Sequence, residues 1–257
     1  MIKLALIGQH IEHSKSPQLF AAAYHNIQRY SYKRIPATTV GKAMRLFHSI
    51  PLHGINVTAP YKRTILNYID QYSEEVELVG AANVIVRRND KIVAYNTDVA
   101  GVTDAFIQNG VAIYGKKALV FGAGGAGHAA AYALKKGGAR VFWTNRTTAG
   151  MKNRAQQYKV HCISFGEIAE HIAKMDLIVN TLPPTAGILH TLSLHEAQVV
   201  LDADYEYNPL EKIAAAGHAR YINGLSWLLW QAVPSFFYFT GIMPDTNAMR
   251  RTLLDEN

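Results

Sequence analysis

Short apolar runs alternate with longer segments of mixed polarity through the first part of the chain. The runs have strand length, and the longer segments have the spacing of amphipathic helices. Strands are predicted at residues 4–7, 32–35 and 55–57, and helices at residues 18–28, 41–48 and 63–69. This alternation is typical of βαβ units and predicts a mainly parallel sheet. Residues 84–87 and 92–95 flank an Asn-Asp turn, which predicts a hairpin, and a domain boundary is expected near Asp98.

A second series of apolar runs begins near residue 118. A strand at 118–121 leads through a glycine-rich turn and an alanine-rich helix to a strand at 140–144, as in a dinucleotide-binding unit. Later elements are predicted as strands at 177–179 and 199–201 and as helices at 225–238 and 246–254. The last of these helices is expected to pack back on the first domain. The pattern therefore predicts an α/β protein of two domains.

Composition favours a globular enzyme over a nucleic-acid-binding or membrane protein. Hydrophobic residues make up 49% of the 257 positions and charged residues 18%, which is sufficient for a buried core. The net charge of +7 comes from basic residues scattered along the chain, so no nucleic-acid partner is expected. The uncharged stretch 225–244 contains Gln231 and Pro234 and is interpreted as a buried helix and its exit, so no membrane association is expected.

The single cysteine, Cys162, has no partner for an intrachain disulfide and is interpreted as a buried apolar thiol. This usage is typical of a reducing compartment and predicts a cytoplasmic location. The apolar run at 4–7 is too short for the hydrophobic segment of a secretory signal. The 11 histidines form no H-E-x-x-H motif or compact cluster, so no metal site is predicted.

A glycine-rich segment follows the strand predicted at 118–121. It reads G-x-G-x-x-G, which permits a tight turn and close approach of the backbone to a pyrophosphate, so a nucleotide cradle is favoured over a flexible loop. The residues predicted to line it are Gly122, Ala123, Gly124, Gly125 and Ala126.

The residues that follow the next strand favour one nucleotide. NAD sites usually offer a carboxylate about twenty residues beyond the glycines, whereas NADP sites offer a cation to the 2′-phosphate. This chain has Asn145, Arg146 and Thr147 there, which provide a guanidinium and no acid. NADP is therefore the predicted cofactor.

Four clusters of small polar residues in the first region lie at or beside the ends of predicted strands. In open α/β sheets ligands lie beyond the carboxyl ends of the strands, so the clusters predict a hydroxyl-rich pocket. Any one cluster has a structural explanation, because Ser14, Ser16 or Asp98 could simply cap a helix. The four together favour a binding site. They are residues 13–17, 56–62, 80–83 and 96–98.

The ordered motifs H-S-x-S-P, N-V-T-x-P-x-K, G-A-x-N, N-T-D, G-A-G-G-A and N-R-T resemble those of the shikimate dehydrogenase family. D-x-x-Y at 202–205 and G-L-x-x-L-x-x-Q at 224–231 extend the resemblance through nearly the whole chain. It implies NADP-dependent reduction of 3-dehydroshikimate to shikimate in chorismate and aromatic amino-acid biosynthesis. The implied architecture is a substrate-binding α/β domain at 1–99, joined by 239–257, a Rossmann domain at 100–238, and a cleft between them.

The resemblance also implies roles for individual residues. Ser14 and Ser16 are expected to hold the substrate carboxylate, and Lys62 and Asp98 to lie at the reacting oxygen. Thr58, Asn83 and Gln231 are expected to bind ring hydroxyls of the substrate. Tyr205 is expected to be a further substrate contact. Residues implied as further cofactor contacts are Ala203 and Gly224.

The chemistry of ketone reduction calls for these residue types independently of the resemblance. Hydride transfer leaves negative charge on the oxygen, so a nearby donor that can also release a proton lowers the barrier. Lys62 can supply this donor. Asp98 is expected to orient the ammonium and a substrate hydroxyl, while the nicotinamide carries the hydride.

The chain departs from the family pattern near the cofactor. Thr181 and Leu182 replace the usual alanine and threonine, Ser226 replaces a glycine, and Gly150 stands where many NADP-using members have a second arginine. An NAD-using quinate or shikimate dehydrogenase and a non-catalytic sensor of shikimate-type metabolites are therefore alternatives. Retention of the acid–base pair favours an enzyme with small-molecule partners, expected to be a monomer or homodimer.

Overall fold

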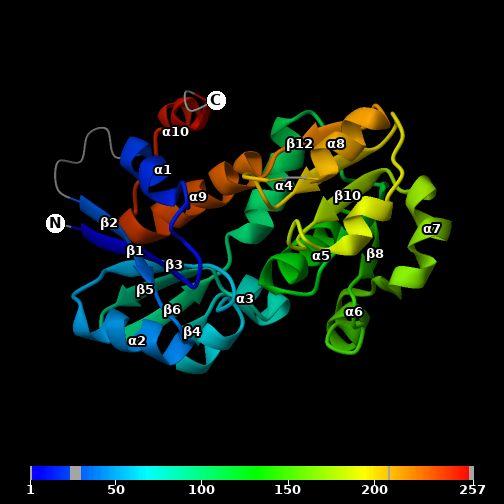
Figure 1. The fold of residues 1–257 in the computed structure, drawn as a ribbon. Coiled ribbons are helices and arrows are strands. Elements are labelled where there is room, and N and C mark those ends of the chain that lie inside the picture. The colour runs from blue at the N-terminus through cyan, green and yellow to red at the C-terminus, as the bar shows by residue number, and fades with distance from the viewer. Residues whose placement is uncertain (1, 24–29, 208, 255–257) are drawn as a thin grey trace. The chain divides into compact units, whose positions relative to one another are not determined.

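The computed structural model describes residues 2–23, 30–207 and 209–254. The chain forms two compact units (Figure 1). The first consists of Met1–Asp98 with Leu228–Asn257, and the second of Val99–Trp227. The described residues of each unit form a six-stranded sheet with flanking helices, so the predicted α/β class is confirmed.

The sheet of the first unit is mixed, with mainly parallel pairing. Its strands are β1 (Ile2–Gly8), β2 (Tyr30–Pro36), β3 (Gly54–Val57), β4 (Gln71–Tyr72), β5 (Val84–Arg88) and β6 (Lys91–Tyr95). They are ordered β2-β1-β3-β5-β6-β4. Strand β1 pairs in parallel with β2 and β3, whereas β5 is antiparallel to both β3 and β6. The predicted hairpin is the β5–β6 pair.

Helices cover both faces of this sheet, which explains why β1 is a continuous apolar run. They are α1 (Ser16–Ala23), α2 (Val40–Ser49), the 3₁₀ helix η1 (Thr64–Tyr68), α3 (Glu74–Val79), the C-terminal part of α9 (Gly224–Thr240) and α10 (Thr246–Leu254). Ala5 and Ile7 of β1 share a core cluster with Phe47 of α2. Because side chains alternate along a strand, Leu4 and Leu6 point to the other face. Helices α1 and α9 lie on that side of the sheet (Figure 1).

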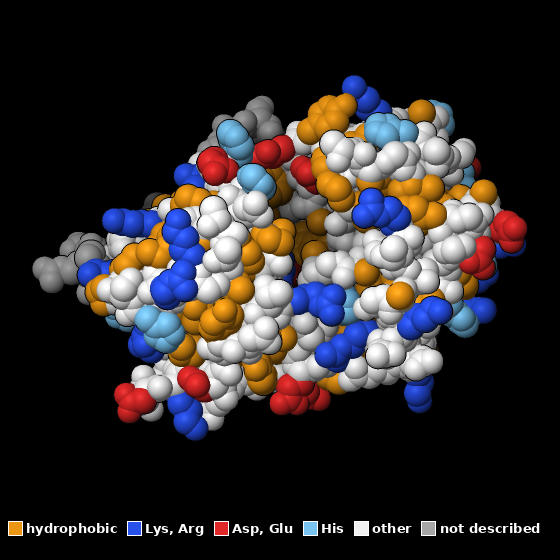
Figure 2. Space-filling model, turned by 60° about the horizontal axis from the view of Figure 1, so that its bottom comes forward, with side chains coloured by type: hydrophobic (Ala, Val, Ile, Leu, Met, Phe, Trp, Pro, Cys, Tyr) orange, Lys and Arg blue, Asp and Glu red, His pale blue; other side chains and the backbone are white. Residues whose placement is uncertain are grey.

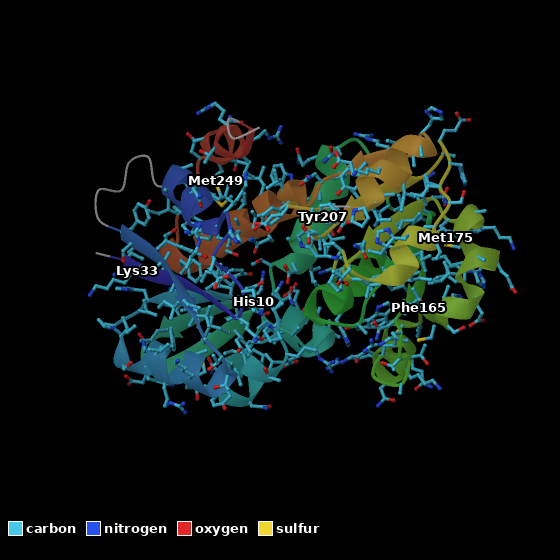
Figure 3. The ribbon with its side chains drawn as sticks, viewed as in Figure 1. His10, Lys33, Phe165, Met175, Tyr207 and Met249 are labelled. Atoms are coloured by element: carbon cyan, nitrogen blue, oxygen red, sulfur yellow. The ribbon has the colours of Figure 1, made fainter. Side chains whose placement is uncertain are left out.

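Aromatic residues join the helices on the α1 side of the sheet. The ring of Phe20 on α1 stacks on Tyr32 at 4.6 Å between centroids and lies 5.9 Å from Phe239 on α9. A Cβ atom on Gly54 would lie 2.5 Å from the Phe239 ring, so a glycine in β3 allows α9 to approach. Helix α10 packs on α1, and its Met249 is fully buried (Figure 3).

The second unit has a parallel sheet in the order β12-β11-β10-β7-β8-β9. The strands are β7 (Lys117–Phe121), β8 (Arg140–Thr144), β9 (His161–Ile163), β10 (Leu177–Asn180), β11 (Val199–Asp202) and β12 (Arg220–Ile222). Counted within the unit, the order is 6-5-4-1-2-3, which is the Rossmann arrangement. The prediction of a dinucleotide-binding fold in this region is confirmed.

One helix precedes these strands, and the others connect them. They are α4 (Asp98–Gln108), α5 (Gly125–Lys136), α6 (Lys152–Tyr158), η2 (Phe165–Glu167), α7 (Ile168–His171), η3 (Ile172–Lys174), η4 (Gly187–Thr191) and α8 (Pro209–Ala216). Helix α5 lies against β7 and β8. Met175 is buried in a separate core cluster with Phe121 of β7, and Phe165 packs against that cluster (Figure 3). Apolar side chains therefore cover the parallel sheet as its buried strands require.

Two predicted helices differ from the structure. The helix predicted at 18–28 is α1, which begins at Ser16, and positions 24–28 lie outside the described residues. The helix predicted at 63–69 is the 3₁₀ helix η1, in which the Ile69 N–H bonds the Leu66 carbonyl at 3.4 Å. Ile65 is its only buried residue, so little packing energy favours a longer α-helix there.

Cys162 corrects the prediction of a buried thiol, because it is only half-buried. It lies in β9, which pairs with β8 alone at the end of the sheet. Partial burial still raises the pKa of the thiol above its ordinary value of 9.0, and the charge of Lys152 acts in the other direction. The Cys162 side chain is incompletely covered because β9 is an edge strand of only three residues.

The surface carries no continuous basic tract on the face drawn in Figure 2, where Lys and Arg side chains are dispersed among others. Among the large apolar side chains of the described residues, those of Tyr114, Tyr207 and Met243 are the most exposed, and they are distant in sequence. None of the described helices combines the length and apolar character needed to cross a membrane.

Asp104 provides a test of the packing around α4. Its carboxyl is half-buried, and burial raises its pKa above the ordinary value of 3.8. The folded state therefore holds the proton more tightly than the unfolded state, and ionisation at neutral pH opposes folding. Asp104→Asn is expected to raise the thermal midpoint at pH 7, and this gain should disappear as pH falls below about 4. Circular dichroism melts across this range measure it, and an equal gain at all pH values would contradict the assignment.

Candidate functional site

Lys62 and Asp98 form an ion pair in the first unit. The Lys62 Nζ lies 2.6 Å from the Asp98 Oδ2. The Lys62 side chain is 16% exposed and the Asp98 side chain 5%, so water screens the pair little. The structure thus brings together the two side chains predicted for acid–base chemistry and leaves the ammonium within reach of solvent.

Hydrogen bonds from neighbouring loops fix both partners of the ion pair. The Lys62 carbonyl accepts a bond of 2.7 Å from the Ala82 N–H. The Asn96 Oδ1 accepts from the Asp98 N–H at 3.0 Å, and the Asn96 Nδ2 donates to the Ala81 carbonyl at 2.8 Å. Asp98 also occupies the start of α4, where the helix dipole favours a carboxylate.

All four polar clusters lie at one edge of the first sheet. Three of them follow β1, β3 and β6, which run in the same direction. The fourth, residues 80–83, precedes β5, and β5 runs in the opposite direction, so its start lies at the same edge. The backbone joins these segments, because the Val57 N–H donates to the Asn83 carbonyl and the Thr58 N–H to the Ile7 carbonyl, both at 2.9 Å.

Ser14 and Ser16 adjoin at the start of α1. The Ser14 Oγ accepts from the Ser16 N–H at 3.3 Å and donates to the Ser16 Oγ at 3.2 Å. Ser14 therefore supports the helix start while its hydroxyl also meets that of Ser16, so the capping role and the ligand role are compatible. Arg34 of β2 donates from Nε to the Ser14 carbonyl at 3.2 Å. Sequence reasoning missed Arg34, because nothing in the strand pattern distinguishes it.

The amides of Asn83 and Gln231 meet in the same unit. The Asn83 Nδ2 donates to the Gln231 Oε1 at 3.1 Å, and the Asn83 Oδ1 accepts from the Thr97 N–H at 2.8 Å. Thr58 is half-buried at the end of β3. Sequence reasoning assigned no role to Thr97 and missed Ser235. The spacing of one helical turn places Ser235 on the same helix face as Gln231 but does not reveal a hydrogen bond between them.

The glycine-rich turn of the second unit fits a pyrophosphate. Gly122 has a φ of +103°, and a Cβ atom on Gly127 would lie 2.1 Å from the Gly122 carbonyl oxygen, so both positions require glycine. Gly124 is exposed at the N-cap of α5, and a Cβ atom there would meet nothing within 4 Å. The start of this helix is accessible, and its N–H groups and dipole favour a phosphate.

Side chains of the neighbouring strands hold this turn. The fully buried Trp143 of β8 donates from Nε1 to the Gly122 carbonyl at 2.7 Å. Thr181, one of the departures from the family pattern, donates from Oγ1 to the Phe121 carbonyl at 2.7 Å. Sequence reasoning missed the role of Trp143, which reads as an ordinary buried strand residue. The turn is therefore held in place by the protein itself.

The loop after β8 carries the residues predicted to select the nucleotide. Arg146 and Thr147 are exposed, and Asn145 is half-buried and donates from Nδ2 to the Thr147 carbonyl at 3.1 Å. An exposed guanidinium at this place can pair with a phosphate through two donors. A Cβ atom on Gly150 would meet nothing within 4 Å, so the loop has room for a side chain there.

Ala203 and Gly224 come together at the loop after β11. A Cβ atom on Gly224 would lie 2.6 Å from the Asp204 carbonyl oxygen and 2.9 Å from the Ala203 carbonyl carbon. Tyr205 is half-buried in the same loop. Within the described residues no group of three His, Cys, Asp or Glu side chains is arranged to hold a metal ion.

Three family descriptions match successive parts of the chain. "Shikimate dehydrogenase substrate binding domain" matches residues 6–85, "Shikimate / quinate 5-dehydrogenase" matches residues 106–202, and "Shikimate 5'-dehydrogenase C-terminal domain" matches residues 224–254. The matches follow the order of the motifs along the sequence.

Individual proteins are similar to this chain over nearly its whole length. The chain is 35% identical to shikimate dehydrogenase (NADP(+)) of Halobacterium salinarum over 260 residues, covering 96% of this chain and 97% of that protein. It is 31% identical to the protein of that name from Carboxydothermus hydrogenoformans over 273 residues, covering 96% and 95%. The crystal structure of shikimate 5-dehydrogenase from Thermus thermophilus in complex with NADP(H) and shikimate is 28% identical, with a TM-score of 0.85 and 100% of both chains covered. The resemblance of the motifs is thus confirmed, and the chain belongs to the shikimate dehydrogenase family.

Proposed function

We propose that this protein catalyses the reversible, NADP-dependent reduction of 3-dehydroshikimate to shikimate, a step of chorismate and aromatic amino-acid biosynthesis. The observation that carries the proposal is the 2.6 Å contact between Lys62 and Asp98 at the sheet edge that also bears the polar clusters. The names of the relatives and the glycine-rich turn support the same activity. A binding protein that senses a metabolite would have little use for an acid–base pair.

The proposed mechanism assigns proton transfer to Lys62. When bound, NADPH supplies the hydride to the carbonyl carbon of the substrate. The Lys62 ammonium donates a hydrogen bond to the carbonyl oxygen, stabilises its developing negative charge and gives it a proton. Asp98 orients the ammonium through Oδ2 and accepts from a substrate hydroxyl with its remaining lone pairs. In the oxidation direction the neutral lysine takes the proton back.

Binding of the two reactants is divided between the two parts of the chain. In this proposal residues 1–99 with 239–257 form the substrate-binding domain and residues 100–238 form the NADP-binding domain, and Tyr205 and Gln231 of the second range also contact the substrate. The substrate carboxylate is held by Ser14 and Ser16. The remaining substrate contacts are Thr58, Asn83, Tyr205 and Gln231, and the cofactor contacts are Gly122, Ala123, Gly124, Gly125, Ala126, Asn145, Arg146, Thr147, Ala203 and Gly224.

The proposal also concerns the setting of the reaction. It places the protein in the cytoplasm, as a monomer or homodimer that acts on small molecules without nucleic-acid or membrane partners. The direct test of the activity follows NADPH absorbance with 3-dehydroshikimate, and the reverse reaction with shikimate and NADP⁺. Turnover with quinate and NAD⁺ alone would contradict the proposal, and no turnover with either nicotinamide would favour a sensor.

Lys62→Ala should lower kcat by about 10²- to 10⁴-fold and change the Michaelis constant for shikimate much less, because the lysine interaction strengthens as charge develops. Steady-state kinetics in the oxidation direction measure both constants. The matched control is Lys91→Ala, which removes an exposed lysine from β6 of the same unit. Near-normal turnover in Lys62→Ala would show that another group transfers the proton.

Ser14→Ala and Ser16→Ala should chiefly raise the Michaelis constant for shikimate. Each should lose roughly 1.5–3 kcal/mol of binding, the range of a hydrogen bond to a charged group. Ser14→Ala should also lower the thermal midpoint, since its Oγ accepts from the Ser16 N–H. The control is Ser49→Ala at the exposed end of α2. Parent-like affinity in both variants would place the carboxylate elsewhere.

Arg146→Ala should lower the specificity constant for NADP⁺ and spare that for NAD⁺, because a single guanidinium pairs with the 2′-phosphate. Gly150→Arg should widen the preference for NADP⁺, since a side chain there meets no neighbour. Arg154→Ala is the control, because this arginine bonds Gln157 on α6. A parent that prefers NAD⁺, or an unchanged ratio in Arg146→Ala, would contradict the assignment of the nucleotide.

A further inference from the structure

Ser235 on α9 is completely buried at the centre of a polar cluster in the first unit. Its Oγ lies 2.7 Å from the Gln231 carbonyl oxygen, 2.9 Å from the Thr97 Oγ1 and 3.4 Å from the Asn56 Nδ2. With no exposed surface, this hydroxyl cannot touch a bound small molecule. Any effect of Ser235 on a ligand must therefore pass through its neighbours.

Each hydroxyl has a single hydrogen, and this fixes which group donates and which accepts in the hydrogen bonds around Ser235. A hydroxyl carries one hydrogen, and a carbonyl oxygen can only accept, so Ser235 donates to the Gln231 carbonyl. The Thr97 hydroxyl must then donate to Ser235. The single hydrogen of Thr97 is thereby used, and its oxygen is left to accept from the Asn83 Nδ2 at 2.9 Å.

The hydrogen-bond directions around Ser235 and Thr97 agree with the orientations of the two amides predicted to bind substrate. The Asn83 Nδ2 points to Thr97 and to the Gln231 Oε1, while the Asn83 Oδ1 accepts from the Thr97 N–H. The Gln231 oxygen is thus engaged inside the protein. The Gln231 Nε2 has two hydrogens and donates one to the Leu228 carbonyl at 3.1 Å, so the second is the polar group that it can offer to a ligand.

We propose that Ser235 is a positioning residue that helps to hold Gln231 so that it presents an N–H donor, rather than its oxygen, to a ring hydroxyl of shikimate. This inference rests on the proposed function, which supplies the substrate. Without the Ser235 oxygen, the Thr97 hydrogen can turn to the Asn83 Oδ1 at 3.2 Å or the Gln231 Oε1 at 3.4 Å. The Thr97 N–H and the Leu228 carbonyl still favour the present amide orientations, but a Thr97 hydrogen turned to the Gln231 Oε1 competes with the Asn83 Nδ2 for that oxygen. Gln231 is then held less firmly, and the site recognises the hydroxyl less well.

Ser235→Ala and Ser235→Cys separate hydrogen bonding from packing, because cysteine fills the space of serine but is a weak donor and acceptor. Both should raise the Michaelis constant for shikimate, and its calorimetric Kd in the absence of cofactor, by on the order of fivefold to tenfold, which lies within the range for one neutral hydrogen bond. The kcat value at saturation and the Kd of NADP⁺ should stay within about twofold, since the reacting groups are untouched. Parent-like shikimate binding in the cysteine variant would mean that Ser235 acts by packing and would overturn the proposal.

A control and a double variant complete the test. Thr240→Ala removes a comparable hydroxyl that bonds the Phe236 carbonyl in the same helix, and it should leave the Michaelis constant unchanged. Adding Ser235→Ala to Gln231→Ala should weaken shikimate binding no further, whereas additive losses would overturn the proposal. If the unmodified protein fails to turn over shikimate, the proposed function fails together with this inference. If the unmodified protein turns over shikimate normally and Ser235→Ala binds shikimate as tightly as the parent, this inference alone is overturned.

Discussion

The ion pair between Lys62 and Asp98 constrains much of the first unit. A carboxylate that is 5% exposed needs a cation and further donors, since removing one partner of a buried pair typically costs about 3–5 kcal/mol. The loop after β3 must therefore place Lys62 beside Asp98 at the start of α4. The Ala82 N–H holds the lysine backbone and Asn96 holds the aspartate backbone, so the pair and its two supporting loops depend on one another.

The direction of β5 makes this arrangement possible. In a wholly parallel sheet, the start of a strand lies at the edge opposite to the ends of its neighbours. Because β5 is antiparallel to β3, residues 80–83 instead reach the edge where the loops after β1, β3 and β6 meet. The Asn83 carbonyl then accepts from the Val57 N–H while its side chain meets Thr97. One reversed strand thus supplies both a structural contact and a polar side chain to the site.

Much of the fold follows from local pattern. The run at 140–144 matches β8, and the final helix at 246–254 matches α10, because a continuous apolar run and helical apolar spacing are properties of the segment itself. Short elements such as β4 and β12 have too few residues for a recognisable period. The distinction between α-helix and 3₁₀ helix at residues 63–69 depends on how little of the segment is buried, which is set by the rest of the fold.

The binding motifs could be found from the sequence, whereas the residues that hold them in place could not. These supporting residues all make the same kind of hydrogen bond. Arg34, Trp143 and Ser235 each donate a hydrogen bond to the backbone carbonyl of a residue predicted to bind a ligand. Their acceptors belong to Ser14, Gly122 and Gln231. A carbonyl is present at every residue and leaves no trace in a motif, so only the three-dimensional contact reveals the donor. By fixing backbone before a ligand arrives, such bonds reduce the entropy lost on binding. Affinity in this chain is therefore expected to depend on side chains that a comparison of binding motifs alone would treat as neutral.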